Sequence, residues 1–252
     1  MILGRRGTLL FFICCLALFA NCAGDKALVK ERAKAKGTLG TALIREGQTR
    51  EGLKYLLDAA KMDPENADLQ GNLGLAYRDL GYYDRSLDQF KKALTLCPDF
   101  PEAKNNMGTV YLLLKEWDKA IACFEEAAGT ILYPTPYFAY FNLGRAYYEK
   151  GNYAKAVESY KKAIKLAPSY STFYANLAGV YEAQGHWEKA IGAYKQAIRC
   201  RPGDPKVYLS LGKLYLRLGR YEKAIPALKK TVEVDPKGHF ATEARELLKE
   251  AM

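Results

Sequence analysis

The sequence predicts an all-α array of six helix pairs, closed at its carboxyl end by one further helix. Two observations support this prediction. Small residues recur every 34 residues, with one step of 36, and aromatic residues follow each of them at fixed spacing. The small residues are Gly40, Gly74, Gly108, Gly144, Ala178 and Gly212. In addition, a proline stands at the end of most units, and proline cannot continue a helix interior. A repeat of this period is typical of stacked helical architectures.

Each recurring residue has a structural reason. Gly74 and Ser86 lie where the two helices of a pair must approach closely, because a larger side chain would force them apart. The other units place alanine at the second position: Ala120, Ala156, Ala190 and Ala224. Bulky residues fill the space around these contacts: Tyr77, Tyr111, Tyr147, Tyr181 and Tyr215, and later Phe90, Phe124, Tyr160 and Tyr194. Glycines allow a tight turn between the helices: Gly81, Gly151, Gly185 and Gly219.

This pattern resembles the tetratricopeptide repeat. The resemblance implies a right-handed α-solenoid with a concave groove lined by the first helix of each pair. Five units match well, whereas the first has Leu43 and Gly52 where tyrosine and alanine are usual. The expected units are residues 33–66, 67–100, 101–136, 137–170, 171–204 and 205–238, followed by a capping helix at 239–252.

The start of the chain differs from the repeats. Arg5 and Arg6 precede an apolar run from Leu9 to Ala20, which is too short to span a bilayer as a mature helix. Residues 1–21 are therefore predicted to be a secretory signal peptide, so the protein leaves the cytoplasm. An exported protein meets no nucleic acid.

The end of the leader resembles a bacterial lipobox. In Phe19-Ala20-Asn21-Cys22 the alanine and the cysteine fit the pattern, whereas Phe19 and Asn21 depart from it. The resemblance implies a lipid on Cys22, a tether at 22–32 and, because Ala23 follows the cysteine, the periplasmic face of the outer membrane. Ordinary cleavage nearby and an uncleaved short anchor are the alternatives.

The charge is basic and unevenly spread. The formal net charge is +10, and removal of the leader leaves 36 basic against 28 acidic residues. The excess is concentrated in the unit 205–238, which could face an acidic partner or anionic lipid. An ordinary solvated helix face explains it equally well.

Reactive residues are scarce. Cys97, Cys123 and Cys200 show no spacing typical of a zinc site and allow one disulfide at most; small packing residues are the preferred interpretation. His186 and His239 lie where exposed polar residues are expected. No phosphate loop, nucleophile elbow or metal motif appears. We therefore expect a non-catalytic protein with no cofactor and no small-molecule substrate.

The candidate binding residues form an asparagine ladder. One repeat position on the groove-lining helix holds an asparagine in four units: Asn72, Asn106, Asn142 and Asn176. A primary amide can pair with both the N–H and the C=O of an extended peptide. Packing between units is the competing interpretation. Phe138, Phe141 and Tyr148 are expected nearby in the groove, which favours an amphipathic helix or a partly hydrophobic segment as ligand.

The single step of 36 residues adds two residues to the junction between the third and fourth units. This expanded junction contains Leu132, Tyr133 and Pro134. The stretch from Asn105 to Gly144 is similar to the type IV pilus biogenesis and stability lipoproteins of the PilF/PilW family, as is the layout of leader and six repeats. That resemblance implies a pilotin-like lipoprotein that binds a pilus secretin and supports its assembly. A general periplasmic scaffold for envelope enzymes, such as cell-wall hydrolases or proteases, is the alternative.

Overall fold

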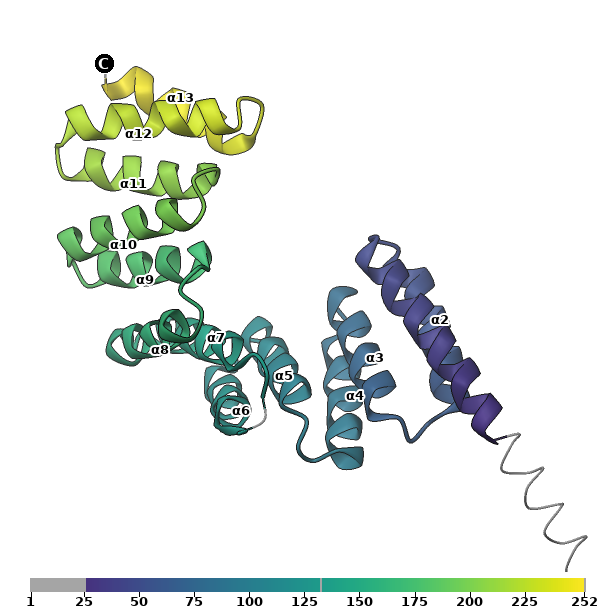
Figure 1. Ribbon diagram of the computed structural model, residues 1–252. Coiled ribbons are helices and arrows are strands. Elements are labelled where there is room, and N and C mark those ends of the chain that lie inside the picture. The colour runs from purple at the N-terminus through teal and green to yellow at the C-terminus, as the bar shows by residue number, and fades with distance from the viewer. Residues whose placement is uncertain (1–25, 132, 252) are drawn as a thin grey trace, which may run out of the picture. The chain divides into compact units, whose positions relative to one another are not determined.

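The computed structural model describes residues 26–131 and 133–251. The predicted leader and lipidation site at Cys22 lie outside these residues. The regular structure of the described part is entirely helical, which confirms the predicted all-α fold (Figure 1). The first helix covers residues 26–45. It is followed by α2 (Thr49–Met62), α3 (Ala67–Asp79), α4 (Tyr83–Leu96), α5 (Pro101–Leu113), α6 (Trp117–Gly129), α7 (Pro136–Glu149), α8 (Tyr153–Leu166), α9 (Ser171–Ala183), α10 (Trp187–Cys200), α11 (Pro205–Arg217), α12 (Tyr221–Val234) and α13 (His239–Ala251).

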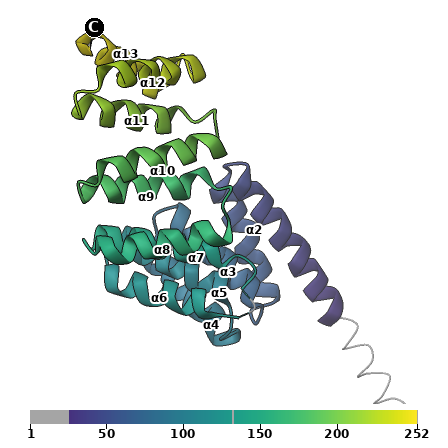
Figure 2. The ribbon, with the colours of Figure 1, turned by 60° about the vertical axis from the view of Figure 1, so that its left-hand side comes forward.

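The chain divides into two compact units between Val110 and Tyr111, within α5. In the first unit, the first helix pairs with α2, and α3 pairs with α4. In the second unit, α7 pairs with α8, α9 with α10, and α11 with α12. The strongest contacts all join helices that are adjacent in the sequence. Figures 1 and 2 show this order plainly for α9 to α13, which are stacked one after another.

The first helix begins earlier than the sequence analysis expected. Residues 26–32, assigned there to a tether, are already helical, so the helix is present at least seven residues before the predicted boundary at residue 33. Lysine, alanine, leucine, glutamate and arginine all have high helix propensity, and this stretch contains little else. Local propensity therefore extends the helix beyond the repeat.

The turn inside each pair uses a residue with left-handed backbone. Glycine supplies it in five turns, with φ between 68° and 84°: Gly47, Gly81, Gly151, Gly185 and Gly219. The next residue then donates its N–H back into the helix, as Tyr82 does to the C=O of Tyr77 at 2.8 Å. The third repeat has Lys115 at this place, with φ of 59°. A side chain in this region is strained, so this turn is the least favourable of the series.

The predicted close approach of paired helices is present in the first unit. A Cβ atom on Gly74 would lie 2.7 Å from the ring of the fully buried Phe90. The buried Ser86 hydroxyl donates a hydrogen bond of 2.7 Å to the Gly74 carbonyl. In the first pair the backbones are closer still, because a Cβ atom on Gly52 would lie 2.5 Å from the carbonyl oxygen of Gly40. This approach explains why the first repeat has glycine where the others have alanine or serine.

The expanded junction leaves α6 at Gly129 and enters α7 at Pro136. Tyr133 is buried there and packs against Ala127 and Ala139, so it shapes the junction from within. Ile131, in contrast, is 97% exposed. Leu132 lies outside the described residues.

The last helix, α13, covers the end of the second unit. Its apolar residues pack against Leu209 of α11 and Leu228 of α12. They are Phe240, Ala244, Leu247 and Leu248. An ion pair between Lys213 and Glu243 links α13 to α11. The buried end of the array is thereby covered by a helix with a polar outer face.

Tyr147 gives the second unit a measurable pH dependence. Its hydroxyl donates a 2.7 Å hydrogen bond to Glu125 of α6. Burial first, and then this carboxylate, raise the pKa of Tyr147 to about 12. The folded chain therefore retains a proton that the unfolded chain loses above the usual pKa of about 10. The resulting stability is complete below that pH and is lost as the pH rises from about 10 through about 12.

We predict that raising the pH from about 9 to about 11 lowers the Tm of Tyr147→Phe less than it lowers the Tm of wild type. The Tm is measured by thermal unfolding at each pH. Tyr82→Phe is the matched control, because the Tyr82 side chain is 52% exposed, and it should behave as wild type. Equal losses in Tyr147→Phe and wild type would contradict the assignment.

Candidate partner-binding site

The four asparagines of the predicted ladder each lie on the first helix of a pair and are half-buried. Asn72 of α3 and Asn106 of α5 belong to the first unit, whereas Asn142 of α7 and Asn176 of α9 belong to the second. The predicted ladder is therefore divided between the two units, with two asparagines in each.

Asn72 and Asn106 line one cavity of about 660 Å³ in the first unit. We call it the amide cavity. Its lining comprises Asp68, Gly71, Asn72, Leu75, Phe90, Phe100, Glu102, Ala103 and Asn106. Neither asparagine side chain has a hydrogen-bond partner among the described residues. Asn72 also borders a neighbouring cavity of about 400 Å³, which the first helix lines with Lys34, Gly37, Thr38 and Thr41.

The chemistry of the amide cavity suits an extended protein segment. Each of the two amides can pair with the N–H and the C=O of a peptide ligand that lies along the cavity. Leu75 and Phe100 provide an apolar wall against which a ligand side chain can pack. Asp68 and Glu102 form no ion pair with described residues, and their carboxylates would favour a basic residue at this end of the ligand.

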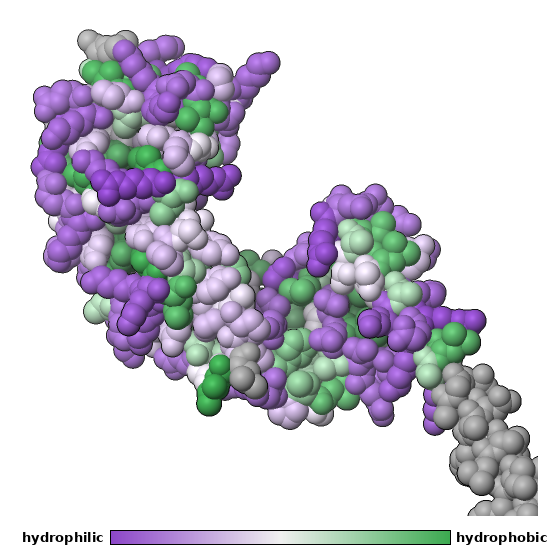
Figure 3. Space-filling view, in the orientation of Figure 1, coloured by the Kyte–Doolittle hydropathy of each residue, from purple (hydrophilic) through white to green (hydrophobic). Residues whose placement is uncertain are grey.

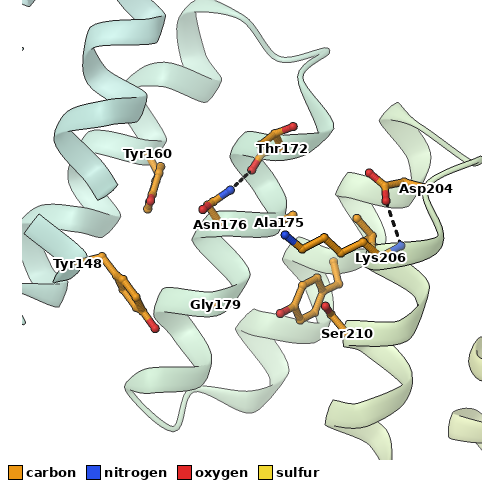
Figure 4. A pocket seen from close by; sticks show the side chains of 11 residues that line it. Tyr148, Tyr160, Thr172, Ala175, Asn176, Gly179, Asp204, Lys206 and Ser210 are labelled. Carbon is orange, nitrogen blue, oxygen red and sulfur yellow. Dashed lines mark hydrogen bonds between the residues drawn. The ribbon is translucent and has the colours of Figure 1, made fainter. Parts of the chain in front are cut away.

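The second unit holds a cavity of about 330 Å³ that extends from α7 to α11 (Figure 4). We call it the α9 cavity. The Asn176 amide nitrogen donates to the carbonyl oxygen of Thr172 at 2.8 Å, which leaves the amide oxygen and one N–H for a ligand. Asp204 caps α11, because its carboxylate accepts from the Lys206 backbone N–H at 3.1 Å. In Figure 4 the Lys206 side chain extends toward Ala175 and Asn176.

Tyrosines in the α9 cavity remain neutral. Burial is the first cause that raises the pKa of Tyr160 and of Tyr194 above the ordinary range. The Tyr194 hydroxyl also donates to Glu182. The Lys206 ammonium and the Asp204 carboxylate both line this cavity, in contrast to the two carboxylates of the amide cavity.

The aromatic residues predicted to lie in the groove have different environments. Tyr148 lines the α9 cavity and is 37% exposed. Phe138 is 38% exposed, and its ring lies 5.7 Å from that of Tyr170. Phe141 instead stacks on Phe173 at 5.0 Å, so much of its surface serves packing between repeats.

Asn142 is not among the residues that line the α9 cavity. Its amide oxygen accepts a long hydrogen bond of 3.5 Å from the Arg145 guanidinium, one turn away on α7. It therefore does not join Asn176 in one site.

Sequence reasoning missed several residues that line the cavities. Phe100 reaches the amide cavity from the loop before α5. Asp68, Glu102 and Thr172 share one position in the second, third and fifth repeats, which Phe138 occupies in the fourth. That position lies four residues before the asparagine, about one helical turn, so the repeat alignment carries the signal that could have found them.

Metal sites, membrane-spanning helices and disulfides can be assessed for residues 26–131 and 133–251. In that part of the chain no group of three or more His, Cys, Asp or Glu side chains could hold a metal ion. None of its helices is long and apolar enough to cross a membrane. Cys123 is buried, and Cys97 and Cys200 are partly buried; the structure describes no disulfide among them.

A stack of helix pairs with open, amide-lined cavities defines a helical-repeat protein of the kind that binds other proteins. The tetratricopeptide repeat family matches residues 38–101 and 141–205, and further matches to it cover 99–169 and 177–249. The chain belongs to the tetratricopeptide repeat family. Its fold is typical of non-catalytic protein-binding scaffolds. No curated protein matches the sequence significantly.

Solved structures share the fold over 76% to 86% of the chain. PilW, a widely conserved type IV pilus biogenesis factor, is 23% identical with a TM-score of 0.77, over 84% of this chain and 97% of that one. PilF of Pseudomonas aeruginosa is 19% identical with a TM-score of 0.73, over 86% and 98%. YrrB, with an unusual peptide-binding site, is 19% identical with a TM-score of 0.56, over 76% and 97%. At these identities the likeness establishes the fold.

Proposed function

We propose that this chain is a membrane-tethered, non-catalytic lipoprotein that binds a secretin subunit and supports assembly of the outer-membrane secretin of a type IV pilus machine. The match to PilW, a type IV pilus biogenesis factor, supports the proposal, because it covers 84% of this chain and 97% of that one. The lipobox-like sequence before Cys22 supports placement on the periplasmic face of the outer membrane.

The observation that carries the binding role is the amide cavity. Asn72 and Asn106 lie together in a cavity of about 660 Å³, and neither amide is used by another described residue. An asparagine kept for packing would usually hydrogen-bond within the protein. The two amides are instead available to a ligand.

The mechanism we propose is an increase of local concentration. An acylated Cys22 would hold the repeats at the membrane, and the cavities would capture newly arrived secretin subunits there. Capture at one surface converts encounters between subunits in the periplasm into encounters on the membrane, where the multimer forms.

The proposal predicts that secretin multimers disappear when the gene is deleted and return with the wild-type gene. Restoration with Cys22→Ser should leave the multimers in the inner membrane. Cys97→Ser is the matched control, because Cys97 is a partly buried cysteine of the repeat body, and it should restore assembly. The measurement is the heat-resistant multimer in separated inner and outer membranes.

Normal multimers at the outer membrane of the deletion strain would refute the secretin role. The general periplasmic scaffold would then be the function to pursue, with envelope enzymes such as cell-wall hydrolases or proteases recovered as partners from membranes.

A further inference from the structure

The first helix is longer than the repeat requires. In the repeat register, α3 begins at Ala67 and α11 at Pro205, whereas the first helix is already helical at residue 26, seven residues before the equivalent position, residue 33. Residues 26–32, which we call the extension, add about two turns and about 10 Å. Every residue of the extension is exposed, and the first buried residue of the described chain is Ala33. The extension therefore contributes nothing to the described core.

The composition of the extension does not suit a solvated spacer. Leu28 is 51% exposed and Val29 is 38% exposed. Leu28 and Arg32 lie one turn apart, and Leu39, which is 44% exposed, continues the same side of the helix two turns later. Figures 1 and 3 show hydrophobic surface among hydrophilic surface where the first helix meets the grey trace.

The extension is also cationic. Lys26, Lys30 and Arg32 are opposed only by Glu31 within it, and none of the three forms an ion pair with a described residue. Exposed apolar side chains among uncompensated cations are the features of helices that lie on anionic lipid surfaces.

We propose that the extension lies on the anionic lipid surface of the membrane. Leu28 and Val29 would lie at the boundary between headgroups and acyl chains, and the side chains of Lys26, Lys30 and Arg32 would contact lipid phosphates. The inference rests on the anchor of the proposed function, because Cys22 lies only four residues before residue 26, the first residue of the extension. The lipid would hold the chain at the membrane, and the extension would hold the first repeat against the surface.

The test uses the mature chain, residues 22–252, with Cys22→Ser so that no acyl chain contributes. This chain retains every buried residue described, from Ala33 onward. Sedimentation with phosphatidylcholine vesicles is compared with vesicles containing about 30% phosphatidylglycerol. We expect binding to the anionic vesicles to be at least about tenfold stronger, and to be lost in about 0.5 M salt.

Two charge-matched variants locate the contact. Lys26→Glu with Lys30→Glu should weaken binding by at least about tenfold. Lys229→Glu with Lys237→Glu makes the same change of charge in the basic last repeat and should leave binding near wild type. Helix content measured by circular dichroism should be equal in all of these proteins.

The inference fails if the two vesicle types bind equally, or if the control variant loses as much binding as the extension variant. The mass of the native protein tests the anchor separately. An acylated Cys22 in a chain whose extension ignores anionic vesicles would overturn the inference and leave the proposed anchoring intact. If Cys22 carried no lipid but the extension bound anionic vesicles, the proposed anchoring would be overturned and the inference would stand.

Discussion

Replacing Gly74 with alanine should lower the free energy of unfolding by about 2 kcal/mol. An alanine in a helix interior normally stabilises by about 1 kcal/mol relative to glycine. Here the added methyl would lie 2.7 Å from the ring of Phe90, which is fully buried and cannot move aside. The clash reverses the usual sign of the substitution.

Gly192→Ala is the matched control for this experiment. Gly192 is exposed within α10, and a Cβ atom there would have no neighbour within 4 Å. This variant should gain up to about 1 kcal/mol in chemical denaturation. If Gly74→Ala were as stable as Gly192→Ala, the conclusion that the paired helices approach closely at Gly74 would be wrong.

The double variant Asn72→Ala with Asn106→Ala should bind the partner at least about tenfold more weakly, with an unchanged Tm. Each lost peptide pairing removes about 0.5–1.5 kcal/mol per hydrogen bond. Neither amide supports another described residue, so the fold loses nothing. Affinity is measured by titration with the purified secretin subunit, and Tm by circular dichroism.

Asn152→Ala provides the opposite pattern. The Asn152 side chain caps α8 by accepting from the Lys155 backbone N–H at 3.2 Å. Its loss should cost about 1 kcal/mol of stability and leave binding near wild type. A large fall of Tm in the Asn72 and Asn106 variant would instead favour a packing role for those asparagines.

The sequence was most informative where one residue type serves one geometric need. Gly74 and Ser86 could be placed at the helix crossing because only small residues fit there. The shared cavity of Asn72 and Asn106 follows from their common position in successive repeats. Periodicity alone conveys both facts.

The remainder depended on contacts that periodicity does not encode. Phe141 shares the groove-facing helix with Asn142, yet it stacks on Phe173, whose place depends on the packing of the next repeat. The helical conformation of residues 26–32 was missed because sparse apolar residues were taken to indicate a tether, whereas helix propensity decided the outcome. The left-handed turn at Lys115 also has no glycine to announce it.

The contacts between sequence neighbours have a consequence for how the chain acquires its structure. The strongest helix contacts close only short loops, so little entropy is lost before each contact forms. Topologies of this kind fold rapidly. A chain synthesised from its amino end could therefore pack each helix pair as it emerges, without waiting for the residues still behind it.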